Sequence, residues 1–265
     1  MKTYIENIGA GALRTGAQIW DIFALFFNTL FWIFLAPFKG KGPSRKLVFE
    51  QMVFMGLRSI MIVFFVSVFT GIVLAMQSAY QLEKMDATMY VASLVGVSLT
   101  RELGPVLTAL VIAGRCGAAI TAELGTMKVT EQIEALETIA LNPVRFLVAP
   151  RFLALLVMVP CLTIMGDMVG MFGGWLVGVY NLKLNSGLYI DTTLRFLENK
   201  DMLTGLFKSV VFSMLICMIG CYQGLNTKGG AEGVGKSTTA SVVTSFIMII
   251  LADCILTGVF YFTDI

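Results

Sequence analysis

The stretch from Ser59 to Leu82 contains no charged residue. A helix rises about 1.5 Å per residue, so about 20 apolar residues are enough to cross the hydrocarbon core of a bilayer. Inside that core every backbone N–H and C=O must find a partner within the segment, and a helix provides these partners. We therefore predict that Ser59–Leu82 is a transmembrane helix.

The composition places the whole chain in the same class. Of its 265 residues 57% are hydrophobic and only 14% are charged, which is typical of an integral membrane protein. The sequence has no His, which excludes His-based catalysis and most zinc sites, and we expect no metal site. Its five Cys are scattered through apolar sequence, so we expect buried thiols and not a disulfide framework.

Hydropathy predicts four further spans. They are residues Ala87–Gly114, Phe152–Leu182, Ser209–Asn226 and Thr238–Phe262. Polar stretches between them, at 115–151, 183–202 and 227–237, are expected to lie outside the bilayer. We predict an all-α integral membrane protein with five transmembrane helices, in which residues 45–265 form one membrane domain.

The N-terminal residues 1–44 form a separate segment. Residues 1–18 are weakly amphipathic, and Ile22–Phe38 is uncharged and rich in aromatic residues, with Trp20, Phe23, Phe27 and Phe34 on one helical face. About seventeen residues are marginal for a span, and aromatic belts favour the membrane interface. We expect an interfacial or re-entrant helix, with a full span as the alternative.

The second span carries two charges inside apolar sequence. Arg101 and Glu102 have about fourteen uncharged residues before them and about twelve after. A charge at this depth requires a partner or water. Pro105 cannot donate to the carbonyl of Arg101, so we expect a kink and a polar site inside the bundle. The alternative is a structural ion pair between helices.

An acidic amphipathic helix is predicted between the second and third spans. Thr130 would cap its N-terminus, Glu131 and Glu134 would occupy its first turn, and Asn142-Pro143 would end it. Its apolar stripe contains Val129, Ile133, Leu136 and Ala140, and about ten residues are too short to cross a membrane. This helix is either a solvated loop or a docking element for a soluble partner.

Four glycines repeat at every fourth position of the third span, at Gly166, Gly170, Gly174 and Gly178. Small residues at this spacing let another helix approach closely. The ridge predicts either packing within the chain or a dimer contact.

The positive-inside rule orients the chain. The basic loop at 39–46, the segment 115–151 and the loop 227–237 contain most of the Lys and Arg. We therefore place these segments, and the acidic helix with them, on the cytoplasmic side.

Residues 230–237, GAEGVGKS, match the phosphate-binding pattern G-x-x-x-x-G-K-[ST]. That pattern binds phosphate when a strand precedes it and a helix follows it in an α/β sheet, and no alternation of strands and helices is predicted here. We interpret the match as accidental, and the segment as a flexible cytoplasmic turn. The chain is accordingly not expected to be an enzyme.

Four segments resemble the MlaE-type permease family. They are RELGPVLTALVIAGRCGAAITAELGTMKVTEQIEAL, NPVRFLVAPRFLA, GIVLAMQ at 71–77 and GGAEGVGKSTTASVV at 229–243, and the resemblance covers about residues 45–262. It implies the membrane subunit of an ABC transporter that carries phospholipid between the inner and outer membranes of a diderm bacterium. It further implies a second copy of the chain, a separate ATPase that binds the ATP, a periplasmic MCE protein and a small STAS-type subunit, with no cofactor in the chain itself and no nucleic acid.

The resemblance also assigns roles to residues. It implies a coupling helix at about 123–141 that contacts the ATPase, and the candidate residues there are Glu123, Met127, Lys128, Glu131, Glu134 and Leu136. It implies a lipid pathway near Arg101 and Glu102, to which we add Gln77 and Pro105. The four ridge glycines are the candidates for helix packing or the dimer contact.

Two other functions are weighed against this one. An ion-coupled secondary transporter or channel would use Arg101, Glu102, Asp167 and Asp253 as an ion path, and would transport without ATP. A membrane-bound nucleotide hydrolase would use Lys236, and the purified chain alone would then be active.

Overall fold

The computed structural model describes residues 20–35 and 42–263, and all the elements in these residues are helical. Five helical segments are long and apolar enough to cross a membrane. They are Arg45–Glu83, Thr88–Val129, Val144–Tyr180, Asn199–Leu225 and Gly230–Phe262. The prediction of an all-α integral membrane protein with five spans is confirmed.

The spans contain several interruptions. The first consists of α2 (Arg45–Met55), the short helix η3 (Leu57–Ser59) and α3 (Ile60–Glu83), and the second begins with η4 (Thr88–Tyr90). The second continues through α4 (Val91–Ser98), the π-helical turn η5 (Leu99–Leu103), α5 (Gly104–Ile112), the π-helical turn η6 (Ala113–Gly117) and α6 (Ala118–Val129). The third begins with η7 (Val144–Val148) and continues as α8 (Ala149–Tyr180), while α10 (Asn199–Leu225) and α11 (Gly230–Phe262) are the last two.

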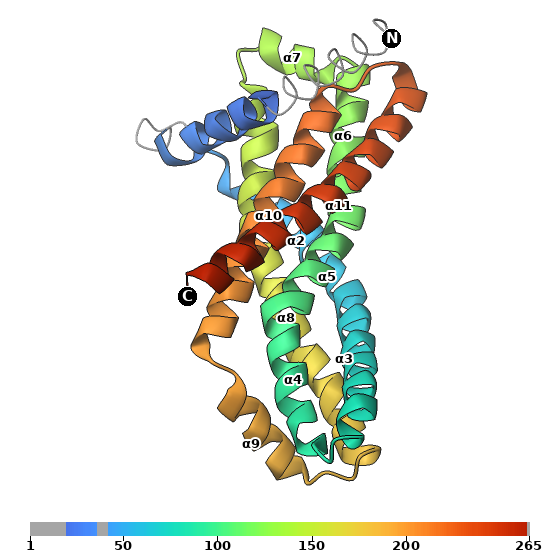
Figure 1. The fold of residues 1–265 in the computed structure, drawn as a ribbon. Helices are drawn as coiled ribbons and strands as arrows, with labels where there is room; N and C mark the ends of the chain where they lie inside the picture. Colours follow the sequence, from blue (N-terminus) through green and yellow to red (C-terminus); the bar gives the residue numbers. More distant parts are fainter. Residues whose placement is uncertain (1–19, 36–41, 264–265) are drawn as a thin grey trace, which may run out of the picture.

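Two short helices lie at opposite ends of the bundle. Between the second and third spans, α7 (Gln132–Thr138) lies at the upper end in Figure 1. Between the third and fourth, α9 (Ser186–Phe196) lies at the lower end. The loop predicted at 183–202 therefore contains a helix, whose start is capped by the side chain of Asn185 accepting from the N–H groups of Gly187 and Leu188.

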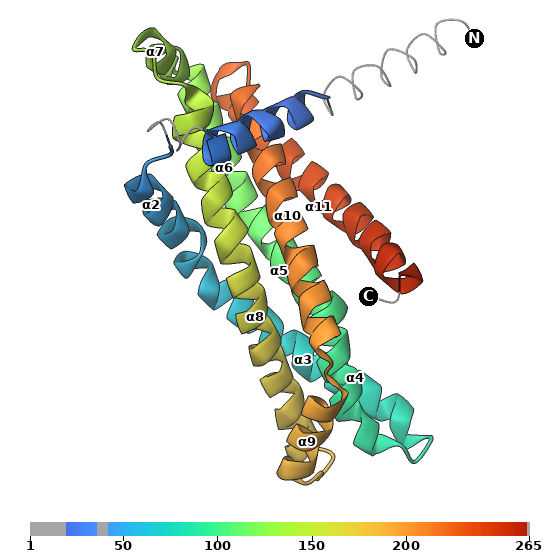
Figure 2. The ribbon, with the colours of Figure 1, turned by 90° about the vertical axis from the view of Figure 1, so that its left-hand side faces the viewer.

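The described part of the N-terminal segment is a helix from Trp20 to Leu35, which ends in the π-helical turn η1 (Phe31–Leu35). It lies crosswise to the spans, near the end of the molecule that carries α7 (Figures 1 and 2). Phe26 packs edge-on against Phe152 of α8, with 5.9 Å between ring centroids, and the guanidinium of Arg145 lies over Trp32. Residues 1–19 and 36–41, which include the predicted amphipathic stretch and the first part of the basic loop, lie outside the described residues.

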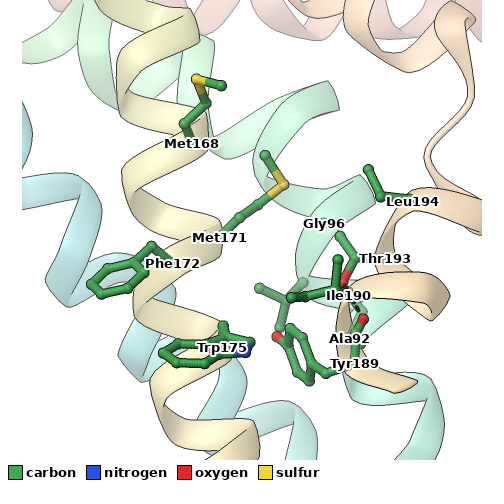
Figure 3. Close-up of a pocket in the computed structure, with 11 residues that line it drawn as sticks. Ala92, Gly96, Met168, Met171, Phe172, Trp175, Tyr189, Ile190, Thr193 and Leu194 are labelled. Carbon is green, nitrogen blue, oxygen red and sulfur yellow. Dashed lines mark hydrogen bonds between the residues drawn. The ribbon is translucent and has the colours of Figure 1, made fainter. Parts of the chain in front are cut away.

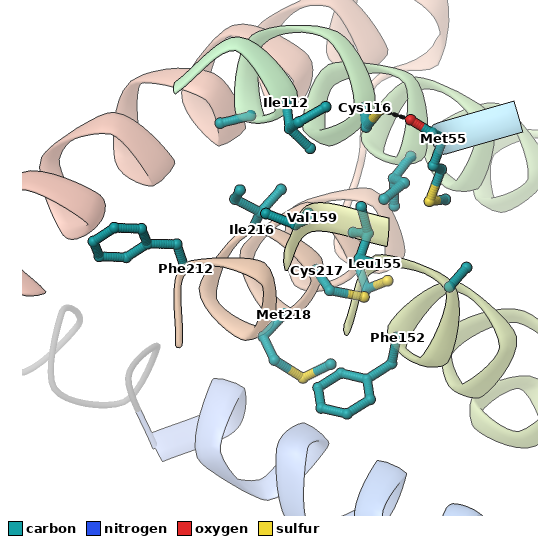
Figure 4. Packing of buried hydrophobic residues seen from close by; sticks show 14 of the residues in the cluster. Met55, Ile112, Cys116, Phe152, Leu155, Val159, Phe212, Ile216, Cys217 and Met218 are labelled. Carbon is teal, nitrogen blue, oxygen red and sulfur yellow. Dashed lines mark hydrogen bonds between the residues drawn. The ribbon is translucent and has the colours of Figure 1, made fainter. Parts of the chain in front are cut away.

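The main core lies where α5, α6, α8 and α10 meet (Figure 4). Its largest buried side chains include Phe152, Phe212, Ile112, Leu155 and Ile216. All five cysteines are free. Cys116, Cys217 and Cys221 are buried, but Cys161 and Cys254 are exposed on the outer faces of their helices, so the expectation of buried thiols is wrong for these two.

Five predicted boundaries are wrong for one physical reason. The second helix does not end at Gly114 but continues to Val129. The first, third, fourth and fifth helices begin before their predicted starts, at Arg45, Val144, Asn199 and Gly230. Helices can continue past the bilayer into water until a turn or cap ends them. Hydropathy locates the apolar part of each helix and not its end.

Candidate functional site

A π-helical turn presents the two charges of the second span. Pro105 has no N–H, so the carbonyl of Arg101 cannot receive the usual helical hydrogen bond. The chain widens there to the π turn Leu99–Leu103, in which the N–H of Gly104 donates to the carbonyl of Leu99. Single π turns are frequent at functional sites. This turn directs Arg101 and Glu102 toward different partners on α10.

Glu102 belongs to a cluster of charges contributed by three spans. The ammonium of Lys208 on α10 lies 2.5 Å from a carboxylate oxygen of Glu102 and 2.9 Å from one of Asp253 on α11. It also donates to the hydroxyl of Thr257, 2.8 Å away. The Lys208 side chain is only 1% exposed, and a buried charge of this kind requires such partners.

A close approach of two helices makes this cluster possible. Gly205 on α10 lies directly against the carbonyl of Thr100 in the π turn, and a Cβ there would also lie 3.3 Å from Cγ of Pro105. A larger residue would therefore separate α10 from the second span. Lys208 follows Gly205 by about one helical turn, which brings its ammonium beside Glu102.

Arg101 has a different environment on the same turn. Its guanidinium lies 3.7 Å from a carboxylate oxygen of Asp201 at the start of α10, and its side chain is 38% exposed. It lines a cavity of about 470 Å³ together with Glu198, Lys200, Asp201, Thr204, Phe260 and Tyr261. A half-exposed guanidinium at the wall of a polar cavity is suited to bind a phosphate or a carboxylate.

The other two residues predicted for the lipid pathway lie apart from this cavity wall. Pro105 is buried and packs against α10 near Gly205. Gln77 is exposed on the outer face of α3. The structure therefore joins Arg101 and Glu102 to residues of α10 and α11, and not to Gln77.

The end of the second span carries the residues predicted to couple to a soluble partner. Thr130 does not cap the start of α7: it follows α6, and its hydroxyl donates to the carbonyl of Thr126. Glu131 and Ala140 both adopt left-handed backbone conformations and bound a helix of seven residues, Gln132–Thr138. The prediction of a helix of about ten residues is wrong at both ends, because the left-handed residues Glu131 and Ala140 interrupt the helical backbone on either side.

Residues 130–140, which include α7 and which we call the tip, are attached to the spans by ion pairs. Lys128 of α6 pairs with Glu134 of α7, and the hydrogen bond from Lys128 lowers the pKa of Glu134. At the base of the tip, the buried guanidinium of Arg151 lies 2.8 Å from a carboxylate oxygen of Glu123. Ile133 is buried, and Met127 and Leu136 pack against the main core. The tip is therefore mechanically connected to α6 and α8.

Outward from these contacts, the tip presents an acidic and apolar surface. Glu131 and Glu137 are exposed, and Ile139 is 64% exposed. Exposed apolar residues rimmed by charge are typical of a protein contact.

The glycine ridge of α8 lies against helices of the same chain. Gly170 meets the backbone of Gly71 on α3, and a Cβ at Gly166 would lie 2.8 Å from Oγ of Ser67. A Cβ at Gly174 would lie 2.8 Å from Cγ1 of Val95 on α4, and one at Gly178 would lie 2.5 Å from Cε2 of Tyr189 on α9.

The phosphate-binding pattern at 230–237 is part of a helix. Its residues form the first turns of α11, and Lys236 pairs with Glu232 one turn earlier, with both side chains exposed. No strand precedes it in the described residues, so the context that the pattern needs is missing there. The expectation of a flexible turn is also wrong, because α11 begins at Gly230, and within 229–237 positive φ values occur only at Gly229 and Gly230.

Sequence reasoning missed three functional candidates, Lys208, Asp201 and Ile139. Lys208 lies one residue before the predicted fourth span, Ser209–Asn226, and outside the predicted loop 183–202. A signal for it existed, because Glu102 and Asp253 each place an acidic group within an apolar span and a cation is the expected partner. Glu198 and Asp201 form a reciprocal capping box that starts α10 at Asn199, and that spacing would have placed Lys208 inside the helix.

Comparisons with known proteins agree with this architecture. Residues 48–259 match the family described as Permease MlaE. The chain is 44% identical over 215 residues to a probable ABC transporter permease protein of Rickettsia prowazekii, covering 81% of this chain and 83% of that one. It is 36% identical over 250 residues to the intermembrane phospholipid transport system permease protein MlaE of Haemophilus influenzae, covering 93% and 95%.

A plant protein is also similar. The chain is 35% identical over 231 residues to the chloroplastic protein TRIGALACTOSYLDIACYLGLYCEROL 1 of Arabidopsis thaliana, covering 86% of this chain and 65% of that one. The family match spans all five membrane segments except their outermost ends. This chain therefore belongs to the MlaE permease family.

Proposed function

We propose that this chain is the permease subunit of an ABC-type transporter that moves phospholipid between the inner and outer membranes of a diderm bacterium. The observation that carries the proposal is the charged site within the spans, where Arg101 lines a polar cavity and Lys208 holds Glu102 and Asp253. The printed name of the Haemophilus relative supports phospholipid as the cargo. In this proposal the chain lies in the inner membrane.

Arg101 is the residue we assign to the lipid headgroup. Its guanidinium is half exposed, and its contact with Asp201 is long at 3.7 Å, so a phosphate can compete for it. Lys208 is fully buried between two carboxylates and has no such freedom. We assign to Lys208 the role of holding α10 and α11 against the π turn.

A separate ATPase supplies the energy in this proposal, and the chain itself binds no ATP or other cofactor. The acidic and apolar tip formed by Glu131, Glu137 and Ile139 would be the surface that the ATPase contacts. Movement of the tip would pass to α6 through the Lys128–Glu134 pair and to α8 through the Glu123–Arg151 pair. Rocking of packed helices is a known way to alternate access to such a site.

We further propose a second copy of the chain, a periplasmic MCE protein and a small STAS-type subunit on the ATPase. The four ridge glycines lie against α3, α4 and α9 of their own chain. A second copy would therefore have to use another surface, and the apolar outer faces of α3 and α11 are available.

The first experiment purifies the tagged full chain in mild detergent and identifies the proteins and lipids that accompany it by mass spectrometry. We expect an ATPase, an MCE protein and phospholipid. Recovery of the chain alone and free of lipid, from cells that express those partners, would contradict the proposal.

An ion-coupled transporter is the second candidate, because Glu102, Lys208 and Asp253 form a connected set of ionisable groups inside the membrane segments. Liposomes that contain the chain alone distinguish the two functions. Transport driven by an ion gradient without ATP would favour the second candidate, and strict dependence on the ATPase would favour the first.

A further inference from the structure

A second cavity lies at the end of the bundle opposite α7. It has a volume of about 410 Å³ and is bounded by α4, α8 and α9 (Figure 3). The charged residues of the lipid-headgroup site do not line it. Its size is within the range of about 300–1,000 Å³ that is typical of pockets for small ligands.

We call this second cavity the cleft. Its lining is apolar at the floor and at the rim. Ala92 and Val95 of α4 are fully buried at the floor. The rim includes Met168, Phe172, Ile190 and Leu194, all of which are exposed apolar side chains. An exposed apolar rim on a membrane protein faces lipid more readily than water.

The helix α9 has the character of an element at the membrane surface. Leu188, Ile190, Leu194 and Phe196 are exposed apolar residues within its eleven positions. The indole N–H of Trp175 near the end of α8 donates to the hydroxyl of Ser186, 3.1 Å away. Trp and Tyr at this position are typical of the zone where the polar and apolar parts of a lipid meet.

One polar group in the cleft has no partner. Tyr189 is 4% exposed, and among the described residues no group accepts a hydrogen bond from its hydroxyl. Its ring extends from α9 toward α8 across the lower end of the cleft (Figure 3). Burial raises the pKa of Tyr189 to about 12, so the hydroxyl remains a donor. An unpaired buried donor is unfavourable and calls for an acceptor.

The backbone of α8 is shaped around this ring. A Cβ at Gly178 would lie 2.5 Å from Cε2 of Tyr189, and one at Gly174 would lie 3.1 Å from its hydroxyl oxygen. Real Cβ atoms essentially never approach as closely as 2.5 Å, and 3.1 Å is tighter than most Cβ contacts. These two glycines therefore allow the ring to lie at the floor of the cleft with its hydroxyl beside α8.

We propose that this cleft binds one acyl chain of a membrane glycerolipid, and that the hydroxyl of Tyr189 donates to the ester carbonyl of that lipid. The apolar floor and rim accept the chain, and the unpaired hydroxyl at the floor supplies a hydrogen-bond donor for its ester group. This site goes beyond the proposed transport function, because binding here requires neither transport nor the headgroup cavity at Arg101.

Trp175 lines the cleft and serves as the reporter. The sequence has three Trp, and the substitutions Trp20→Phe and Trp32→Phe leave Trp175 alone. The purified full chain in detergent is titrated with a phosphatidylcholine that carries bromine atoms on its acyl chains, which quench indole fluorescence on contact. We expect quenching that saturates. Quenching that only rises linearly with lipid would overturn the proposal, because it would report unspecific contact.

The apolar rim and the Tyr189 hydroxyl are tested by separate variants, the rim first. Ile190→Phe with Leu194→Phe fills the cleft at exposed positions, and we expect it to remove the saturable quenching. Ile247→Phe with Leu251→Phe, at exposed apolar positions of α11, is the matched control and is expected to leave quenching unchanged. Equal quenching in the filled variant would overturn the proposal.

Tyr189→Phe removes only the hydroxyl. One hydrogen bond predicts about a two- to tenfold rise in the half-saturating concentration of the ester lipid. An ether-linked brominated phosphatidylcholine lacks the carbonyl and is expected to bind equally to both proteins, and Tyr80→Phe, at an exposed position of α3, is the control. An unchanged half-saturation for the ester lipid would refute the role of Tyr189.

Saturable quenching of the free chain that disappears in the complex with partner proteins would identify a protein segment as the occupant and overturn the proposal.

Discussion

Lys208 shows how one residue can hold three spans together. It is the cation between Glu102 and Asp253, and its removal would leave two carboxylates in an apolar surrounding. Loss of one partner from a buried ion pair costs about 3–5 kcal/mol. Since Glu102 and Asp253 remain 34% and 23% exposed, we expect Lys208→Met to lower the free energy of unfolding by about 3 kcal/mol.

Denaturation of the purified chain in detergent measures this value. The control Lys236→Met removes an exposed cation and is expected to change little. Adding Glu102→Gln and Asp253→Asn to Lys208→Met is expected to restore most of the stability, because no unpaired charge is then left. A triple variant as unstable as Lys208→Met would show that the loss comes from packing and not from charge.

Gly104 and Asp167 form a second contact at the residue scale. Asp167 on α8 is buried, and one of its carboxylate oxygens lies where a Cβ of residue 104 would be. Gly104→Ala is therefore expected to destabilise the chain by about 1–3 kcal/mol through overpacking. With Asp167→Ala in the background, the added methyl has room, and we expect the cost of Gly104→Ala to fall.

A double-mutant cycle over these two positions measures the coupling. Purely additive losses would mean that Gly104 is required for the π turn alone, where its Cβ would also lie 2.9 Å from the carbonyl of Leu99. Asp167 is one of the residues named for the alternative of an ion path. Its position beside Gly104 also connects it to the turn that presents Arg101 and Glu102.

At this scale the sequence was informative where a charge stood alone in apolar residues. Arg101 and Glu102 were found because charge within a span is unfavourable without a partner. Lys208 was missed because hydropathy starts the fourth span at Ser209, so its charge falls just outside the predicted apolar segment. The partners of a charge depend on how helices pack, and composition along the chain does not contain that information.

At the scale of elements, α7 depends on the pair between Glu134 and Lys128. The pKa of Glu134 is lowered from 4.5 by that hydrogen bond, so the pair contributes stability above the unfolded pKa. This contribution is lost as pH falls through the folded pKa, below 4.5. We expect the amides of Gln132–Thr138 to lose protection from hydrogen exchange between about pH 6 and about pH 3.

Glu134→Gln is the control for this prediction. It removes the titrating group, so protection of α7 should be lower at the higher pH and should no longer depend on the pair. If the wild-type chain and Glu134→Gln lose protection in parallel, another group is responsible for the change.

The exposed face of the same element carries the proposed docking surface. Charge reversal at Glu131 and Glu137, both exposed, is expected to uncouple ATP hydrolysis from transport while the chain remains inserted. Glu134 is left intact in this test because its reversal would also break the pair with Lys128. Reversal at Glu232, which is exposed on α11, is the control, and transport that persists in the Glu131 and Glu137 variant would contradict the docking role.

Elements were predicted well inside the bilayer and poorly beyond it. Each apolar run was recognised, since the membrane requires a helix there. Gly230, Gly233 and Gly235 made the start of α11 look like a turn, because glycine disfavours helices by about 1 kcal/mol per residue. Tertiary contacts override that preference: the hydroxyl of Thr121 on α6 donates to Ser241 of α11, 2.8 Å away.

For the whole molecule, the spans divide into a packed group and two outer helices. Half or more of the apolar window is buried in the second and fourth spans, compared with 22% in the first and 11% in the fifth. Figure 2 shows the C-terminal part of α11 leaning away from the bundle. The cavity at Arg101 lies against this part, since Phe260 and Tyr261 line it. Movement of α11 would therefore change access to Arg101.

Arg101→Ala tests, in the complete transporter, whether Arg101 binds the lipid headgroup at this cavity or only stabilises the fold. The contact between Arg101 and Asp201 is long and partly exposed, and such pairs contribute about 0–1 kcal/mol to stability. Its loss should leave the abundance of the protein nearly unchanged. If Arg101 binds the lipid phosphate, however, the lost charge-assisted hydrogen bonds of about 1.5–3 kcal/mol predict a roughly 10- to 100-fold loss of lipid transfer. Transfer by reconstituted complexes, normalised to the amount of inserted protein and compared with Lys236→Ala, separates the two outcomes. A fall in transfer that only follows a fall in abundance would assign Arg101 a structural role, because a headgroup ligand affects transfer far more than it affects folding.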